Sequence, residues 1–320
     1  MKRVILPCLF AILTACQSER PTAANGRVAI RLQADWYPQP EHGGFYTALA
    51  KGYYAVEGLD VTVLPIGQYT STYQVVSSGG ADFGFGSSDQ VLTSVSNGLP
   101  VRSVAAFMQH DPQAIMMHAD SPVQDFPALE GRAIAAQPGA TWLKFLVSQY
   151  HLKNVREVPA THSVASFLAD KNYIQQIFIT SEPFFVKQAG TPYRTILINT
   201  AGYDPYRTIF GHQRFLDQQP EATRKFVRAS IRGWREYLRD PGPAHELIQK
   251  RNPAQKAELM AFTVQALRDG KFITGDDLSG AAIGQMDPAR WATLNQQLTQ
   301  LGVIRRAINA GQAFTTKFLP

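Results

Sequence analysis

The chain has almost no cysteine. Among its 320 residues only Cys8 and Cys16 occur, and both stand within the first 16 positions. The rest of the chain therefore cannot form a disulfide, a thiol nucleophile or a cysteine-based metal site. Blocks of like charge are also missing. Basic residues outnumber acidic ones by 31 to 25, and without Lys2 and Arg3 the excess falls to four and is scattered. This distribution argues against nucleic acid as a partner.

No hydrophobic stretch near the start is long enough to cross a membrane. The apolar run over 4–14 has about 11 residues, whereas a spanning helix needs about 20. A basic start followed by a short apolar run is typical of a secretory signal. Leu13-Thr14-Ala15-Cys16 resembles the bacterial lipobox, in which the cysteine is diacylated. We therefore predict a signal peptide over 1–16, lipidation on Cys16, a tether over 17–26, and a location in the periplasm or cell envelope on a lipid anchor.

Internal repeats and low-complexity tracts are absent, and strand-like segments alternate with helical ones. Strand patterns fall at 27–33, 60–65, 83–85, 101–108, 114–118, 132–136, 174–180 and 195–199, and helical patterns begin near 42 and 72 and dominate from about 218. Strands separated by helices predict an α/β fold with parallel-rich sheets flanked by helices. In the helical third, Val227, Ile231, Trp234 and Leu238 recur at helical spacing, which predicts one buried stripe with Trp234 in the core.

Two irregular segments indicate that the chain passes twice between two lobes. Residues 109–113 interrupt two apolar strands, and 199–205 follow a strand before the helical third begins. We predict a discontinuous lobe 1 over 27–110 plus 206–320 and an inserted lobe 2 over 111–205. A cleft between lobes that close on hinges is an architecture of solute-binding proteins.

An aromatic segment follows the first predicted strand. Trp36 and Tyr37 stand at the carboxyl end of that strand, and Pro38 and Pro40 hold the next residues extended. Aromatic side chains at a strand's carboxyl end can form a flat wall against a ligand, which makes Trp36 and Tyr37 candidate binding residues. The alternative is a core tryptophan beside a surface turn.

Two further segments run from a strand into a helix and offer polar groups. In one, Ser87 and Ser88 could present hydroxyls and free backbone N–H groups to a carbonyl or an anion. Ordinary helix capping explains these serines equally well. Gly139 and Thr141 repeat the arrangement in the inserted lobe, so we expect them to face the serines across the cleft.

Several motifs, in order, resemble the thiamine-precursor branch of the periplasmic binding proteins. They are Trp36-x-Pro38-x-Pro40-x-His42, Ala50-Lys51-Gly52-Tyr53-Tyr54, Glu57-Gly58-Leu59-Asp60-Val61, Ser78-Gly79-Gly80-Ala81-Asp82-Phe83-Gly84, Leu129-Glu130-Gly131-Arg132, Ile179-Thr180-Ser181-Glu182-Pro183, and Pro220-Glu221 with Lys225-Phe226-Val227. They cover most of residues 28–240. The resemblance implies a type II periplasmic-binding-protein fold with two lobes and a two-crossover hinge.

The same branch contains an enzyme, the fungal thiamine-pyrimidine synthase, and its chemistry needs residues that this chain lacks. Carried along the match, the synthase lysine that binds pyridoxal phosphate falls on Gly86, and its donor histidine falls on Gln90. The synthase's iron-binding cysteine run falls on 203–207, which contains no thiol. A glycine cannot form a Schiff base. We therefore predict a protein that is not an enzyme and that needs no cofactor.

Glu182 is the most specific candidate for a ligand-binding residue in the inserted lobe. It follows a predicted strand and precedes Pro183, and its carboxylate can accept paired hydrogen bonds from an amino group and a neighbouring ring donor, as an aminopyrimidine offers. The alternative is a surface glutamate that caps the next helix. Tyr203 and Tyr206 stand beside the second crossing and either close over a ligand or pack in the core.

The resemblance also places His42 in the ligand site. Neither His42 nor His110 has a second ligand at metal spacing, so we predict no metal, and Asp111 before Pro112 is expected to form a turn. These residues together predict a monomeric solute-binding lipoprotein that carries a pyrimidine thiamine precursor to ABC permease subunits. The alternatives are a solute-binding protein of the same class for a riboflavin-like heteroaromatic or an alkanesulfonate, a pyrimidine synthase, and a ligand-sensing lipoprotein.

Overall fold

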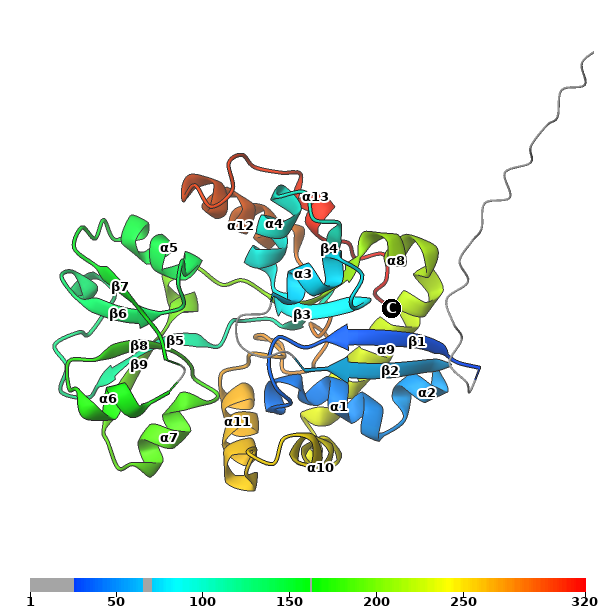
Figure 1. The fold of residues 1–320 in the computed structure, drawn as a ribbon, viewed down its shortest axis with the longest axis horizontal. Helices are drawn as coiled ribbons and strands as arrows, with labels where there is room; N and C mark the ends of the chain where they lie inside the picture. The colour runs from blue at the N-terminus through cyan, green and yellow to red at the C-terminus, as the bar shows by residue number, and fades with distance from the viewer. Residues whose placement is uncertain (1–25, 66–70, 162) are drawn as a thin grey trace, which may run out of the picture.

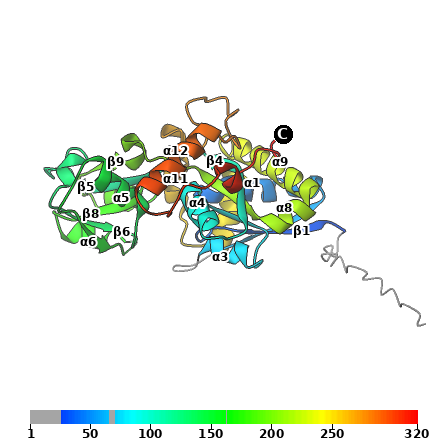
Figure 2. The same cartoon turned by 90° about the horizontal axis from the view of Figure 1, so that it is seen from above.

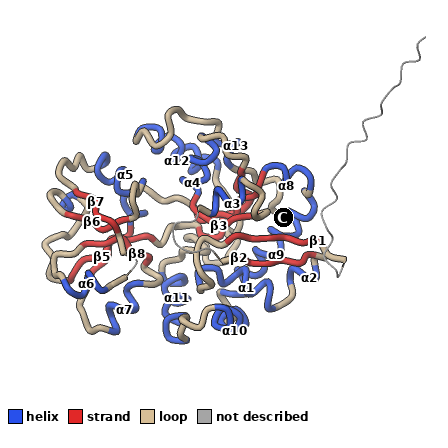
Figure 3. Tube along the Cα trace, in the orientation of Figure 1, coloured by secondary structure: helices blue, strands red, loops and turns tan. Residues whose placement is uncertain are grey.

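The structure is a computed structural model that describes residues 26–65, 71–161 and 163–320. The predicted signal peptide, its lipidated Cys16 and nearly all of the tether lie outside the described residues. Two five-stranded sheets organise the rest (Figures 1 and 3). The first has the order β2-β1-β3-β10-β4 and the second the order β7-β6-β8-β5-β9. We call the parts of the chain built on these sheets lobe 1 and lobe 2.

The strands of lobe 1 are β1 (Val28–Gln33), β2 (Leu59–Leu64), β3 (Phe83–Ser87), β4 (Val101–Met108) and β10 (Arg207–His212), and those of lobe 2 are β5 (Gln113–His118), β6 (Ala133–Ala136), β7 (Arg156–Pro159), β8 (Ile174–Phe178) and β9 (Tyr193–Leu197). The chain thus passes between the sheets twice, after β4 and after β9. Seen from above, β5, β6, β8 and β9 lie at one end of the molecule, and β1, α8 and α9 lie at the other (Figure 2).

The helices of lobe 1 are α1 (Gly43–Ala50), α2 (Tyr53–Val56), α3 (Thr72–Ser77), α4 (Ser88–Ser96), α8 (Gln213–Gln218), α9 (Pro220–Tyr237), α10 (Gly242–Arg251), α11 (Ala257–Asp269), α12 (Pro288–Gln300) and α13 (Ala310–Ala313). Lobe 2 carries α5 (Thr141–Gln149), α6 (Ala165–Ala169) and α7 (Glu182–Gln188). Three short 3-10 turns complete the fold, η1 (Pro40–His42), η2 (Pro127–Leu129) and η3 (Ile198–Ala201). In lobe 1, α1 and α9 cover one face of the sheet, and α4 and α12 lie on the other (Figure 1).

Each sheet has four strands in one direction and a fifth opposed to them, which agrees with the expected parallel-rich arrangement. In lobe 1, β1 pairs in parallel with β2 and β3, whereas β10 is antiparallel to β3 and β4. In lobe 2, β6 pairs in parallel with β7 and β8, whereas β5 is antiparallel to β8 and β9. The two antiparallel strands, β10 and β5, each follow a passage between the lobes. The parallel pairs β1–β2 and β6–β7 are each connected through helices, as parallel neighbours require.

Two large cores hold the sheets to their helices. The first packs α1 and α9 against sheet 1, and Val227, Ile231 and Trp234 are fully or almost fully buried in it, as their spacing predicts. The second lies on the opposite face of sheet 1 and continues into lobe 2 through Tyr203 and Tyr206. This shared core fixes where the two lobes meet.

Candidate functional site

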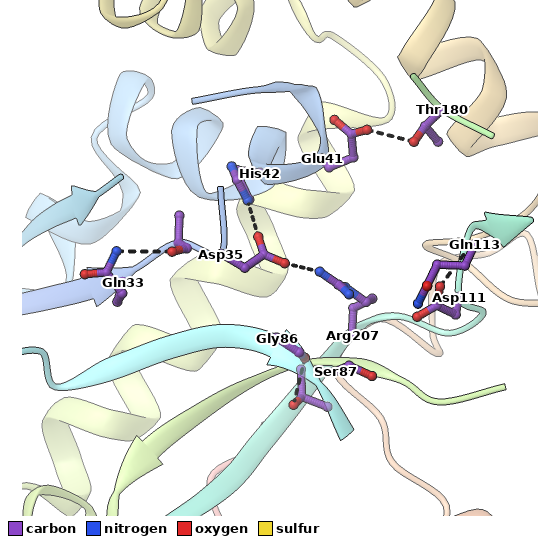
Figure 4. A network of polar contacts seen from close by, with 12 residues as sticks. Gln33, Asp35, Glu41, His42, Gly86, Ser87, Asp111, Gln113, Thr180 and Arg207 are labelled. Atoms are coloured by element: carbon purple, nitrogen blue, oxygen red, sulfur yellow. Dashed lines mark hydrogen bonds and ion pairs between the residues drawn. The ribbon is translucent and has the colours of Figure 1, made fainter. Parts of the chain in front are cut away.

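The candidate site lies where the carboxyl ends of the parallel strands of both lobes face each other. In α/β sheets these ends leave backbone groups and loop side chains free for ligands. Lobe 1 contributes the segments after β1 and β3, and lobe 2 contributes those after β6, β7 and β8. Figure 4 shows polar side chains from both lobes gathered there.

Arg207, the first residue of β10, stands at the centre of this region. Its guanidinium forms an ion pair with Asp35 and lies 5.6 Å from the ring centroids of both Phe85 and Phe178. Phe85 belongs to β3 of lobe 1 and Phe178 ends β8 of lobe 2, so the cation touches aromatic rings of both lobes. Burial opposes the charge, but Asp35 and Asp111 raise the pKa of Arg207 above its ordinary value.

Asp35 is held in place from two sides. His42 Nε2 lies 2.7 Å from Asp35 Oδ1, while Asp35 Oδ2 faces Arg207. Burial tends to raise the pKa of Asp35, but the Arg207 guanidinium and His42 outweigh it and bring the pKa below the ordinary value. His42 is completely buried and also lies edge-on to Phe85. Its observed contacts are with Asp35 and the core.

The aromatic segment after β1 is partly open to solvent. Trp36 is half-buried and Tyr37 is 48% exposed, and their rings meet edge to face at 5.6 Å. The exposed Tyr37 gives this loop an apolar surface at the mouth of the region. Of the predicted aromatic residues, these two remain accessible to a ligand.

The serines after β3 are engaged within the protein. Ser87 Oγ donates to Asp89 Oδ1, and Ser88 Oγ accepts from the Tyr206 amide at 2.9 Å. The Ser87 amide donates to Tyr73 Oη at 2.7 Å, so Tyr73 lies over this turn. Ser87 stands at the N-cap position of α4, but its side chain makes no capping hydrogen bond there.

Tyr73 also covers Gly86. A Cβ placed on Gly86 would lie 2.3 Å from Tyr73 Oη, so a side chain at this position could not be accommodated without moving the ring.

The corresponding turn of lobe 2 starts α5. Gly139 has a left-handed backbone with φ 75° and donates its amide to Glu157 Oε1 at 2.8 Å. Thr141 begins the helix, is buried, and adjoins the hydroxyl of Tyr203. That hydroxyl donates to Asp89 Oδ2 at 2.6 Å, and so connects lobe 2 to α4 of lobe 1.

Tyr203 and Tyr206 are packing residues in this structure. Both are almost fully buried in the second core. Tyr203 lies against Phe145 of α5, and Tyr206 lies against Trp291 of α12. The sequence leaves open whether these tyrosines close over a ligand or pack in the core, and their observed contacts are those of core residues.

Glu182 lines a pocket in lobe 2, at the carboxyl ends of β6, β7 and β8. The walls of the pocket are Gln137, Ala160, Thr161, Ser163, Gln175, Gln176, Ile177, Phe178 and Glu182, and the space that they enclose is small, about 30 Å³. Glu182 begins α7, and its Oε2 accepts from the Phe178 amide at 2.9 Å. Burial raises the pKa of Glu182 to about 7. The carboxyl group can therefore gain or lose a proton near neutral pH.

A direct hydrogen bond joins the lobes beside this pocket. Thr180 Oγ1, in the segment between β8 and α7, donates to Glu41 Oε1 of η1 at 2.7 Å (Figure 4). Thr263 of α11 donates to the Thr180 carbonyl, also at 2.7 Å. Burial raises the pKa of Glu41, and the charge of Glu41 adds to the rise for Glu182. The carboxyl group of Glu41 in lobe 1 therefore acts electrostatically on that of Glu182 in lobe 2.

Asp204 ties the two interlobe segments together. Its Oδ2 lies 2.6 Å from His110 Nδ1 and 2.8 Å from Arg290 Nη2, and its Oδ1 accepts from the Asp111 amide at 2.9 Å. The two segments and α12 are therefore held at one carboxylate. Asp111 forms the predicted turn, since its Oδ1 accepts from the Gln113 amide at 2.9 Å.

Within 26–65, 71–161 and 163–320, no three His, Cys, Asp or Glu side chains gather as a metal site would require. None of the helices formed by these described residues combines the length and apolar character needed to cross a bilayer.

Arg207, Asp35 and Glu41 are the site residues that the sequence did not reveal as such. Asp35 and Arg207 are 172 positions apart, and only the fold brings them together. The sequence offers one signal for Arg207, which is a single charged residue at the start of a strand. In the structure, this residue lies where that strand begins, next to the interlobe region.

The fold belongs to a known class. Two five-stranded sheets joined by two crossings form a periplasmic-binding-protein fold. The alkanesulfonate-binding protein SsuA from Xanthomonas axonopodis pv. citri, bound to MOPS, matches it with a TM-score of 0.67 at 11% identity, over 90% of this chain and 98% of that chain. Residues 39–244 match the NMT1/THI5-like family, and the chain belongs to that family. The fold is the one that solute-binding proteins such as this SsuA use.

Three curated relatives are similar over most of the chain. The riboflavin-binding protein RibY of Chloroflexus aurantiacus is 24% identical over 98% of this chain and 95% of its own length. The formylaminopyrimidine-binding protein of Halalkalibacterium halodurans is 26% identical over 76% and 77%. A 4-amino-5-hydroxymethyl-2-methylpyrimidine phosphate synthase, THI11 of Saccharomyces cerevisiae, is 24% identical over 77% and 81%. The family therefore includes binding proteins and enzymes.

Proposed function

We propose that this chain is the extracytoplasmic solute-binding component of an ABC importer, and that it binds a pyrimidine thiamine precursor between its lobes. The observation that carries the proposal is the pocket of lobe 2 with Glu182 in its wall. It lies at the carboxyl ends of three parallel strands, where α/β proteins bind ligands. The likeness to the formylaminopyrimidine-binding protein supports the same ligand class.

The chemistry of Glu182 suits an aminopyrimidine. A pKa of about 7 means that the carboxyl group holds a proton for about half the time at neutral pH. An aminopyrimidine presents an amino donor beside a ring nitrogen, and one shared proton completes two parallel hydrogen bonds between that edge and a carboxyl group. The exposed ring of Tyr37 and the half-buried ring of Trp36 would supply flat surfaces for stacking.

The charges of the region oppose an anionic ligand. Glu182 lines the pocket, Glu41 acts on it electrostatically from η1, and Asp35 already pairs with Arg207, the cation that a sulfonate would need. Placing a sulfonate beside these carboxyl groups would cost free energy through like-charge repulsion. For this reason we place the alkanesulfonate alternative last among the transport ligands.

A riboflavin-like heteroaromatic is the second candidate. The specific observation in its favour is the similarity to RibY, which covers nearly the whole of both chains. A flavin also carries a flat ring with an N–H donor, so Glu182, Trp36 and Tyr37 would serve it by the same chemistry. The two ligands differ in size, and a direct binding comparison separates them.

A synthase role fits the residues poorly. The position that matches the synthase lysine is Gly86, and Tyr73 fills the space where its side chain would begin. No group at that point can form a Schiff base with pyridoxal phosphate. We therefore propose a binding protein without turnover.

The remaining parts of the proposal concern the protein's place in the cell. The motif at 13–16 favours lipidation on Cys16 and attachment of a monomer to the envelope membrane, where ABC permease subunits would receive the ligand. A sensing lipoprotein would use the same site without a permease.

A thermal-shift screen tests the proposal. A ligand present at 100 times its dissociation constant stabilises the folded protein by about 2.7 kcal/mol. We expect stabilisation by formylaminopyrimidine or 4-amino-5-hydroxymethyl-2-methylpyrimidine, and none by ethanesulfonate. Stabilisation by ethanesulfonate alone would refute the proposed ligand class.

A further inference from the structure

Asp111 carries a buried oxygen that no described residue satisfies. The residue stands in the first interlobe segment and is only 3% exposed. Its amide donates to Asp204 Oδ1, and its own Oδ1 accepts from the Gln113 amide. Its Oδ2 has no hydrogen-bond partner among the residues that the structure describes. Leaving a buried acceptor unpaired is costly, and proteins usually avoid it.

The surroundings do not supply a free cation for this oxygen. Arg207 interacts electrostatically with Asp111, and Figure 4 shows its side chain directed toward Asp35, with which it forms its ion pair. Asp89 and Asp204 also face Asp111 and oppose its charge. Asp89 is fully occupied by Ser87, Gln90 and Tyr203. Arg207 pairs with Asp35 and Arg290 pairs with Asp204, so Asp111 keeps an oxygen without a hydrogen-bond partner among the described residues.

A short chain of contacts links Asp111 to the pocket of Glu182. Gln113, which donates to Asp111, also accepts from Gln176 Nε2 at 2.6 Å. Gln176 Oε1 accepts from the Gln137 amide, and Gln137 and Gln176 both line the pocket. Phe178 lines the same pocket and lies against Arg207. Asp111 is thus connected through Gln113 to Gln176 in the wall of that pocket, and it lies beside Arg207 in the interlobe region (Figure 4).

We propose that Asp111 Oδ2 is a second ligand acceptor, which binds an N–H or O–H donor and makes the site select neutral or cationic nitrogen heterocycles against anions. Glu182 would bind one edge of the ligand from lobe 2, and Asp111 would bind another from the segment between the lobes. This inference rests on the proposed function, since it assumes that the ligand lies between the lobes. Asp111 is then a specificity-determining residue as well as the turn residue that its sequence predicts.

Two variants test the proposal. Asp111→Asn keeps the shape and an acceptor for the Gln113 amide, but it removes the charge. Asp111→Ser is a second variant that keeps the turn, because a serine hydroxyl can also accept the hydrogen bond from the Gln113 amide. Asp269→Asn, an exposed residue at the end of α11, is the matched control. Calorimetric titrations with 4-amino-5-hydroxymethyl-2-methylpyrimidine, riboflavin and ethanesulfonate give the dissociation constants of each variant, and thermal unfolding confirms that each is folded.

We expect the ratio of heterocycle to ethanesulfonate affinity to fall by about tenfold or more in both Asp111 variants. It should stay unchanged in Asp269→Asn. If Asp111→Asn and Asp111→Ser shift all three affinities by the same factor, or by none, the proposal is wrong, because a hinge role would affect every ligand alike. A wild-type protein that binds riboflavin but no pyrimidine would refute the proposed pyrimidine and leave this inference standing. A wild type that prefers ethanesulfonate would overturn both.

Discussion

Glu182 and Asp35 show how partners decide the charge of a buried carboxyl group. Both are withdrawn from water, but Asp35 faces Arg207 and His42, and its pKa falls below the ordinary value. Burial raises the pKa of Glu182 to about 7, because the backbone hydrogen bonds from Phe178 and from Glu182 itself do not outweigh it and the charge of Glu41 adds to the rise. Asp35 therefore holds a structural ion pair, whereas Glu182 keeps binding capacity that a ligand can use.

The raised pKa predicts how stability depends on pH. Between the ordinary value of 4.5 and about 7, the folded protein keeps a proton on Glu182 that the unfolded chain has lost. The free energy of unfolding should therefore fall as the pH rises through this window, and the contribution should level off above it. Glu182→Gln should flatten the decline, with little change at pH 4.5 and a gain at pH 8. Urea unfolding across this pH range measures it.

The control for the pH experiment is Glu246→Gln, because Glu246 is exposed on α10. This variant should retain the slope of the parent protein. Equal slopes for the parent and Glu182→Gln would mean that Glu182 does not titrate near neutral pH in the folded protein.

Local patterns in the sequence predicted some residues and not others. Asp111 before Pro112 predicts a turn, and the turn is present. No local pattern predicts that the second carboxylate oxygen of Asp111 lacks a hydrogen-bond partner among the described residues. The serines at 87 and 88 carry a capping signal, and their hydroxyls are bonded inside the protein. Ion pairs such as Asp35 with Arg207 depend on which strands become neighbours, and adjacent residues do not encode that information.

At the level of elements, the packing of α1 against α9 depends on glycines. A Cβ on Gly233 would lie 2.2 Å from the Gly44 carbonyl oxygen and 2.8 Å from the Cβ of Ala48. A Cβ on Gly44 would in turn enter the Trp234 ring. These residues let two helices approach closely, and α9 brings Trp234 into the core of lobe 1.

Gly233→Ala should therefore destabilise lobe 1. Overpacking of a close helix contact typically costs about 1–3 kcal/mol, and thermal unfolding should begin at a lower temperature. Gly242→Ala is the comparison, since its nearest neighbour is the Asp240 side chain at 3.3 Å. If Gly233→Ala unfolds at the same temperature as Gly242→Ala, the close approach of α1 and α9 is not as described.

Most strands were predictable, but β7 and β10 were missed, and the antiparallel pairing of β5 was not predicted. Alternating apolar residues located most strands within one or two residues, as in β2 and β3. The antiparallel placement of β5 and β10 arises because each strand arrives from the other lobe. A strand's direction after such a passage depends on how two lobes pack, which its own residues do not specify.

Across the whole molecule, the hydrogen bond from Thr180 to Glu41 joins the two lobes at the mouth of the site. Thr180→Val removes the donor and leaves the buried Glu41 oxygen unpaired, which costs about 1–3 kcal/mol. We expect the lobes to separate more often, with a larger radius of gyration in small-angle X-ray scattering and weaker ligand binding. Thr293→Val, on the exposed face of α12, should change neither quantity. An unchanged radius for Thr180→Val would show that this bond does not hold the lobes together.

The predicted lipid anchor has its own test. Cells that express the full chain and receive a fatty acid analogue should label the parent protein, because the motif at 13–16 ends in Cys16. Cys16→Ala should lose the label, and Cys8→Ala, which alters the other cysteine, should keep it. Equal labelling of the parent and Cys16→Ala would exclude this residue as the site.

The central claim is that Glu182 binds the edge of an aminopyrimidine between the lobes, and calorimetric titration of Glu182→Gln tests it most directly. The amide swaps one acceptor for a donor and leaves a ligand group unpaired, so 4-amino-5-hydroxymethyl-2-methylpyrimidine should bind about five- to two-hundred-fold more weakly. Trp36→Ala should weaken every flat ligand alike, because stacking does not read the edge of a ring. A dissociation constant that is the same in Glu182→Gln and the parent protein would contradict the account and remove this residue from the site.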